Sequence, residues 1–148
     1  MPLRGISTKI FKTMIQKVSL IMGANRGFRL DNGEPLESLN PKELFLFATG
    51  ECAGLTITHL LNEHIVNVTN FTISVEGTLS TPTLVAESRF TSFNIIYRIE
   101  CRTLKDQIVI SRAINLAHEK YCGLVQMARK IAPLTHETSI VTTGETEE

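Results

Sequence analysis

The sequence predicts an α+β fold in which a curved antiparallel sheet wraps around one long buried helix. Three patterns indicate it. A run that starts near Asn40 is apolar on nearly every helical face, as a buried helix is. Residues 67–76 and 88–101 alternate between apolar and polar side chains, which is typical of half-buried strands. After Thr103 the apolar residues recur at helical spacing.

The size and composition favour one ordinary domain. Its 148 residues fit a single unit over 1–148, with frayed tails expected at 1–7 and 144–148. Fifteen basic residues balance fifteen acidic ones, which argues against a nucleic-acid or anionic-membrane surface. No signal peptide is seen and no run approaches a membrane span, so we expect a cytoplasmic protein. In that reducing compartment the three cysteines are not a structural disulfide set, and any pairing would be transient and chemical.

The first forty residues are the most ambiguous part. Residues 8–22 have apolar side chains at helical spacing, yet Val18–Met22 also suits a strand. The glycines and asparagine of residues 23–27 predict a tight turn, after which alternation resumes at Phe28. We therefore expect strands joined by that turn, followed by a surface loop over 31–39.

The central helix has a clear start and an unusual middle. Asn40 is the expected N-cap, Pro41 occupies the first turn, and Glu43 completes a capping box. Glu51 then places a charge among apolar residues, which is costly without a partner. Gly54 weakens a helix by about 1 kcal/mol relative to Ala, so a neighbour is expected to need clearance there.

The second half continues as two strands, two helical segments and a last strand. From residue 67 a half-buried strand runs to a predicted turn at 77–83, and a second strand at 88–101 pairs with it antiparallel. Thr103 and Asp106 mark a helix start, a third helical pattern follows Gly123, and Pro133 ends it. Residues 135–142 form the closing strand.

Cys122 and Cys52 are the candidate reactive groups. Cys122 stands at or just before the first turn of a helix, where N–H groups and the helix dipole stabilise a thiolate. Cys52 lies in the buried helix and would need an arginine or a similar donor to ionise. The alternative for both is that they are small buried apolar residues, which fully explains Cys101 on the apolar face of its strand.

Two other uses of these residues stay open. Together with Cys52 and Cys122, His59 and His118 permit a Cys₂His₂ metal site, although neither half has the tight pairs of structural zinc. A hydrolase with a cysteine nucleophile and histidine base is also possible, although nothing marks an oxyanion hole. His64 and His136 are expected at the surface.

Taken together, the residues resemble the OsmC/Ohr family of thiol-dependent peroxidases, in its less-characterised OsmC-like branch. The similarity runs from about Gly27 to Val141. Its most specific parts are the segment Asn40-Pro41-Lys42-Glu43-Leu44, the helix core Gly50-Glu51-Cys52, and His118-Glu119-Lys120-Tyr121-Cys122.

The resemblance implies an intertwined homodimer with active sites at the subunit interface. It implies that Cys52 is the peroxidatic cysteine, that Cys122 is the resolving cysteine, and that organic hydroperoxides are the substrates in oxidative-stress defence. An external dithiol of lipoyl or thioredoxin type would restore the thiols, with no bound cofactor. A non-catalytic protein that binds a small ligand or senses redox state at the interface is the alternative.

The resemblance also suggests two activating residues. Arg29 is the nearest match to the arginine that activates the peroxidatic thiolate. The family's glutamate stands ten positions before the first cysteine, where this chain has Lys42, and Glu43 is one residue further on. That step turns Glu43 about 100° around the helix.

Overall fold

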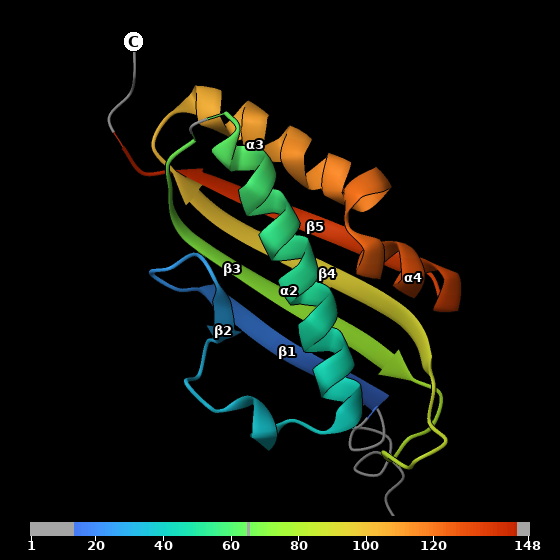
Figure 1. Cartoon of the computed structure of the whole chain (residues 1–148). Coiled ribbons are helices and arrows are strands. Elements are labelled where there is room, and N and C mark those ends of the chain that lie inside the picture. The colour runs from blue at the N-terminus through green and yellow to red at the C-terminus, as the bar shows by residue number, and fades with distance from the viewer. Residues whose placement is uncertain (1–13, 65, 145–148) are drawn as a thin grey trace, which may run out of the picture.

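One mixed sheet forms the base of the structure, and the helices cover one of its faces (Figure 1). The computed structural model describes residues 14–64 and 66–144. Within those ranges the strand order is β2-β1-β3-β4-β5. The strands are Ile15–Met22 (β1), Phe28–Leu30 (β2), Val68–Leu79 (β3), Phe90–Cys101 (β4) and Leu134–Thr142 (β5). The helical segments are a 3-10 turn at Leu36–Ser38 (η1), Pro41–Asn62 (α2), Leu104–Leu116 (α3), a π-helical turn at Ala117–Tyr121 (η2) and Gly123–Ile131 (α4).

The ambiguity near the N-terminus resolves in favour of strands. β1 pairs antiparallel with both β2 and β3, and Leu20 lies opposite Leu30 on one side and Ile73 on the other. The turn after it is closed by the Gly23 N–H, which donates to the Gly27 carbonyl at 2.6 Å. Arg26 has the left-handed φ of 69° within that turn. Residues 8–13 lie outside the described residues, as do the tail expected at 1–7 and all but Gly144 of the tail expected at 144–148.

The α+β class is confirmed, but the expectation of a wholly antiparallel sheet is wrong at its last strand. β5 runs parallel to β4, with Phe93 opposite Leu134 and Cys101 opposite Thr142. The reason is the connection: α3, η2 and α4 carry the chain back along the sheet before β5 begins (Figure 1). A parallel pair needs such a crossover, whereas an antiparallel pair needs only a turn.

The turn predicted at 77–83 begins later than expected, because β3 continues through Gly77 to Leu79 and the bend follows at residues 80–83. Gly77 pairs with Gln16 and Phe93 in the sheet. A Cβ at this position would lie 2.4 Å from Cε1 of Phe90. The glycine therefore accommodates an aromatic ring in the interior of a strand rather than a change of direction.

α2 begins as the sequence predicts. The Asn40 side chain accepts from the Glu43 N–H at 2.8 Å, and the Glu43 carboxylate accepts from the Asn40 N–H at 3.0 Å. A Cβ at Gly54 would lie 2.6 Å from the Phe28 ring and 2.8 Å from Cδ1 of Ile73. The expected need for clearance at Gly54 is therefore confirmed: the glycine lets α2 lie close to the sheet.

α2 is only half covered. It is long and apolar enough to cross a membrane, contrary to the expectation that no run would be, but half of its most apolar stretch is buried inside the fold. That burial is typical of a core helix. Apart from Pro41 and Asn62 at its two ends, its exposed positions are one helical turn apart or multiples of it, and form the α2 stripe: Leu44, Ala48, Leu55 and His59. Glu51 is only partly buried, so its charge needs no buried partner.

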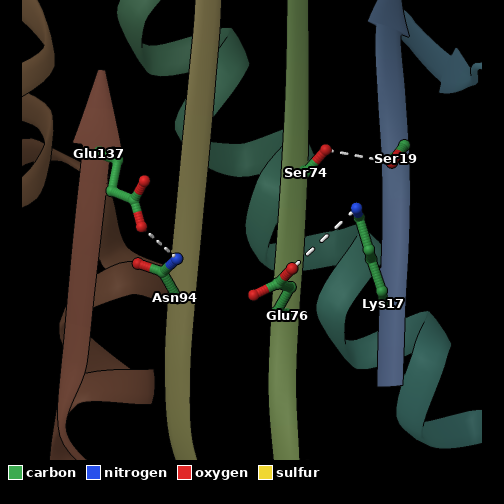
Figure 2. A network of polar contacts seen from close by, with 6 residues as sticks. All are labelled: Lys17, Ser19, Ser74, Glu76, Asn94 and Glu137. Carbon is green, nitrogen blue, oxygen red and sulfur yellow. Dashed lines mark hydrogen bonds and ion pairs between the residues drawn. The ribbon is translucent and has the colours of Figure 1, made fainter. Parts of the chain in front are cut away.

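The face of the sheet opposite the helices is polar (Figure 2). Ser19 and Ser74 form a hydrogen bond of 3.1 Å between β1 and β3. Lys17 and Glu76 make an ion pair of 4.0 Å nearby, and the Asn94 amide donates to Glu137 at 2.9 Å. The apolar core lies between the other face of the sheet and the helices.

Substituting Gly54→Ala tests the close approach of α2 to the sheet. Alanine favours a helix by about 1 kcal/mol, but the added methyl group would overlap Phe28 and Ile73. Overpacking of this kind costs about 1–3 kcal/mol, so we expect a net loss of stability in urea unfolding. Gly123→Ala is the matched control, because a Cβ there meets nothing within 4 Å. Equal stability of the two variants would contradict this packing.

Candidate functional site

The structure brings Cys52 and Cys122 together. Cys52 lies in the middle of α2 and Cys122 caps the start of α4, and their sulfur atoms are 3.1 Å apart. Both are free thiols. Cys52 is partly exposed, whereas Cys122 is fully buried. A disulfide bond is about 2.05 Å long, so a small movement would suffice for the two sulfurs to bond.

A π-helical turn positions Cys122. After α3 ends at Leu116, the chain widens into η2, and the Cys122 N–H donates to the Ala117 carbonyl five residues earlier at 2.9 Å. The Arg129 guanidinium of α4 donates to the His118 carbonyl at 2.9 Å and secures the turn from the other side. Wide turns of this kind occur often at functional sites. Here η2 directs both His118 and Cys122 into the interior.

The environment of Cys122 differs from the one that its sequence position predicts. Backbone N–H groups of Leu124 and Val125 do favour the thiolate, as expected at a helix start. Burial is the larger effect, and the hydrogen bond to Cys52 adds to it, so that the pKa of Cys122 rises to about 12. Cys122 is therefore a neutral thiol in this arrangement, and the expectation of a stabilised thiolate is wrong for its net effect.

Tyr97 and His118 form a buried polar pair that the sequence reasoning did not find. The Tyr97 hydroxyl on β4 lies 2.6 Å from Nε2 of His118. His118 also stacks on His136 of β5, with ring centroids 4.0 Å apart. The expectation that His136 is a surface residue is thus wrong: it is half-buried against His118. Tyr97 lies on the apolar face of the strand predicted at 88–101, and a buried tyrosine usually has a hydrogen-bond partner. That position was the sequence signal for a buried polar pair.

Burial keeps this pair neutral. It lowers the pKa of His118 to about 3, and the nearby His136 and Arg129 act in the same direction. Burial also raises the pKa of Tyr97 well above its usual range, and the charges of Cys122 and then Cys52 raise it further.

Arg29 and Glu43 are not brought to Cys52 within one chain. Arg29 is exposed on β2, where its guanidinium donates to the Leu30 carbonyl at 3.5 Å. Glu43 is held by the capping box and lies nine residues before Cys52, about 13.5 Å along the helix. Lys42 is occupied as well, because its ammonium donates to the carbonyls of Val85 at 3.3 Å and Ala86 at 3.4 Å. The roles suggested for Arg29 and Glu43 stay predictions.

The two histidines that a metal site or a hydrolase would need have other partners in the structure. His59 is exposed and pairs with Glu63 at 3.6 Å, and His118 is bonded to Tyr97. Among residues 14–64 and 66–144, no group of three or more possible ligands could hold a metal ion. Neither histidine is therefore placed as a metal ligand or as a base for the thiols.

A depression of about 520 Å³ lies along the second half of α2 and beside Tyr121 at the end of η2. Neither cysteine lines it, but two of its residues neighbour them in the chain: the Thr56 hydroxyl donates to the Cys52 carbonyl at 2.8 Å, and Tyr121 precedes Cys122. The other lining residues are Leu55, His59, Leu60 and Glu63. This mixture of apolar side chains and one histidine–glutamate contact offers space for a small, mainly apolar molecule.

Comparison with known proteins identifies the family. A family model described as OsmC-like protein matches residues 32–137, well over half of the chain. The chain belongs to the OsmC-like family. This OsmC-like protein is 28% identical to Protein YhfA of Escherichia coli (strain K12) over 114 residues, which are 76% of this chain and 81% of that protein.

Solved structures share its fold. The crystal structure of a hypothetical protein from Aquifex aeolicus VF5 superposes with a TM-score of 0.60 at 22% identity, covering 90% of this chain and 96% of that one. An organic hydroperoxide resistance protein from Elizabethkingia anophelis superposes with a TM-score of 0.50 at 14% identity, covering 84% and 95%. These likenesses confirm the OsmC/Ohr-like α+β fold.

The difference between the two thiols predicts the order in which they react with an alkylating reagent. In the native protein we expect iodoacetamide to modify Cys52 first, because it is partly exposed and Cys122 and Cys101 are buried. Reaction at Cys122 should quicken about tenfold with each pH unit above neutral, because only the thiolate reacts. Peptide mapping by mass spectrometry measures both rates. Preferential modification of Cys122 at neutral pH would contradict this arrangement.

Proposed function

We propose that this OsmC-like protein reduces organic hydroperoxides with Cys52 as the peroxidatic and Cys122 as the resolving cysteine. The contact of 3.1 Å between their sulfurs carries the proposal. Their unequal exposure supports the order of reaction, because a substrate in solution reaches the partly exposed Cys52 before the buried Cys122. Family membership supports a redox role connected with peroxides.

The proposed cycle has three steps. The Cys52 thiolate attacks one peroxide oxygen, the O–O bond breaks, and the other oxygen takes a proton and leaves as an alcohol. The Cys122 sulfur then attacks the sulfenic acid on Cys52, so that an S–S bond forms and an S–O bond breaks. The hydroxyl group takes the thiol proton and leaves as water. An external dithiol of lipoyl or thioredoxin type reduces the disulfide by exchange, and no bound cofactor takes part.

The depression along the second half of α2 suits the alkyl part of the substrate. Its leucines provide an apolar wall, and Thr56 and Tyr121, which also line it, are near neighbours of Cys52 and Cys122 in the chain. A reducing, cytoplasmic location belongs to the same proposal, because the resting protein must carry thiols.

We further propose that a second copy of the chain covers the α2 stripe and completes the site. Leu44 and Leu55 are 39% and 45% exposed there, and Met127 and Ile131 of α4 are 58% and 55% exposed. Apolar surface of this kind is typical of an interface. The second copy would also be the source of an arginine for Cys52, since Arg29 of the same chain points elsewhere.

A second function, binding of a small ligand or sensing of redox state without catalysis, is favoured by one observation. Burial keeps Cys122 neutral, and in the described part of the chain no arginine or lysine side chain is hydrogen-bonded to either sulfur. A protein of this kind would keep its thiols unpaired when peroxide is added.

Peroxide consumption separates the two functions. With dithiol and an organic hydroperoxide in excess, we expect turnover by the parent chain and background loss only by Cys52→Ser. Without dithiol and with a single equivalent of peroxide, Cys122→Ser should stop as the sulfenic acid, which a cyclic dione traps for mass spectrometry. Cys101→Ser is the matched control and should turn over normally. Equal consumption by Cys52→Ser and the parent chain would refute the mechanism.

Leu55→Glu tests the interface. A carboxylate in the centre of an apolar interface is costly to bury, so we expect the dimer to weaken by at least about tenfold. Sedimentation velocity over a range of concentrations measures the change. Val141→Glu is the control, because Val141 is 45% exposed on the edge strand β5 and does not belong to the α2 stripe. A parent chain that sediments as a monomer would remove the basis for a shared site.

A further inference from the structure

The contact between Cys52 and Cys122 is also the geometry of a binding site. Their sulfur atoms are 3.1 Å apart and both cysteines are free thiols. Cys122 is fully buried, whereas Cys52 is partly exposed and gives access to the pair. Cysteine sulfurs are soft ligands that select soft elements. Two of them in contact can bind one such atom between them, and this use of the pair needs no peroxide.

The separation of the two sulfurs determines which element fits. With a bond of about 2.3 Å to each sulfur, a central atom that bridges 3.1 Å makes an S–X–S angle of about 85°. A tetrahedral zinc ion needs an angle of about 109°, which would place its sulfurs ~3.8 Å apart. Linear two-coordinate ions need a wider gap still. Trivalent arsenic is pyramidal, with bonds to sulfur of similar length and angles near a right angle, so it fits the pair as it stands.

The backbone holds both sulfurs at this separation. α2 lies against the sheet at Gly54, two residues after Cys52, where a Cβ would lie 2.6 Å from a neighbouring aromatic ring. On the other side, the Cys122 N–H donates to the Ala117 carbonyl at 2.9 Å, and the Cys122 carbonyl accepts from the Gln126 N–H at 3.1 Å. Two ligands that are already in place lose little conformational freedom when they bind, and this favours affinity.

The chain supplies two bonds to such an atom and no third. In the part of the chain that the structure describes, no group of three or more His, Cys, Asp or Glu side chains could hold a metal ion. The Cys101 thiol donates to the Thr103 carbonyl at 3.5 Å, away from the pair. Nε2 of His118 is bonded to the Tyr97 hydroxyl. The third bond of the arsenic therefore goes to a substituent that the ligand brings, so the fit is to an organoarsenical rather than to arsenite.

We propose that Cys52 and Cys122 chelate trivalent organoarsenicals of the type R–As(OH)₂, the hydrated form of an arsine oxide. Two As–S bonds form and two As–O bonds break. Each thiol proton leaves with a hydroxyl group as water, so the arsenic-bound hydroxyl is the proton acceptor even for the buried Cys122. Arsenic stays trivalent throughout, and the reaction needs neither an oxidant nor a reductant.

The chelate and a disulfide exclude each other, because they use the same two sulfurs. Only the reduced protein binds the arsenical, and the bound arsenical blocks every reaction of the pair. The inference goes beyond the proposed peroxidase function and does not rest on it, since two free thiols in contact are sufficient. A parent chain that consumes no peroxide would sink that function and leave the chelate as it stands.

Mass spectrometry of the reduced full chain with one equivalent of phenylarsine oxide is the test. We expect one phenylarsenic group per chain with loss of two thiol protons, and a proteolytic digest in which the peptides of Cys52 and Cys122 stay joined through arsenic. An excess of a monothiol should leave the adduct in place and 2,3-dimercaptopropanol should remove it, because only a second chelate competes with the first. An adduct on a single cysteine, or one that the monothiol removes, would overturn the proposal.

Single substitutions test the sharing of the arsenic. Cys52→Ser and Cys122→Ser should each weaken binding at least about 100-fold, because the second bond of a chelate forms within one complex. Cys101→Ser is the matched control and should bind as the parent chain does. Equal affinity of the parent and Cys122→Ser would contradict the shared site. Circular dichroism establishes that each variant is folded, and the digest of the parent chain decides where one is not.

Arsenite tests the assignment of the third bond. Bound to two sulfurs it keeps a hydroxyl group, which water exchanges, so we expect gel filtration to strip arsenite from the parent chain and to leave the phenylarsenic group bound. Retention of arsenite to the same extent would contradict the selectivity for organoarsenicals.

Discussion

The close packing of α2 on the sheet is the constraint on which the site depends. Two glycines one helical turn apart permit it: a Cβ on Gly50 would lie 2.7 Å from Val75, and one on Gly54 would lie 2.6 Å from Phe28. Because the interior of a protein is close-packed, a larger residue at either place would move the helix away from the sheet. Cys52 lies between the two glycines, so its contact with Cys122 depends on the same packing.

The fold could be predicted further from the sequence than the site could. Capping at Asn40 and alternation in β3 and β4 are local signals, and both were interpreted correctly. The direction of β5 is set by what the three helical segments between the strands do together, and no local pattern reports that. A glycine at position 77 favours a turn on local grounds, whereas its neighbour Phe90 comes close only after the strands have paired.

The two cysteines were predicted as a pair from a resemblance, and their proximity is a fact of tertiary structure. The sequence does not show which effect on the pKa of the Cys122 thiol is larger, burial or the N–H groups at the helix start. Its place at a helix start was visible and favours the thiolate, but the depth of its burial was not, and burial is the larger effect. For the same reason Tyr97 and His118, distant in sequence, were not recognised as partners, and His136 was placed at the surface.

The parallel pairing of β4 with β5 ties the site to the order in which the chain is made. α3, η2 and α4 form the crossover between these strands, and Cys122 lies on that crossover. Of the described elements β5 is made last, and contacts between distant segments of a chain form only after both are present. A nascent chain in which α2 and Cys52 are already present therefore still lacks β5, which completes the crossover that carries Cys122. The pair is a product of the finished domain, and until then its sulfurs behave as separate thiols.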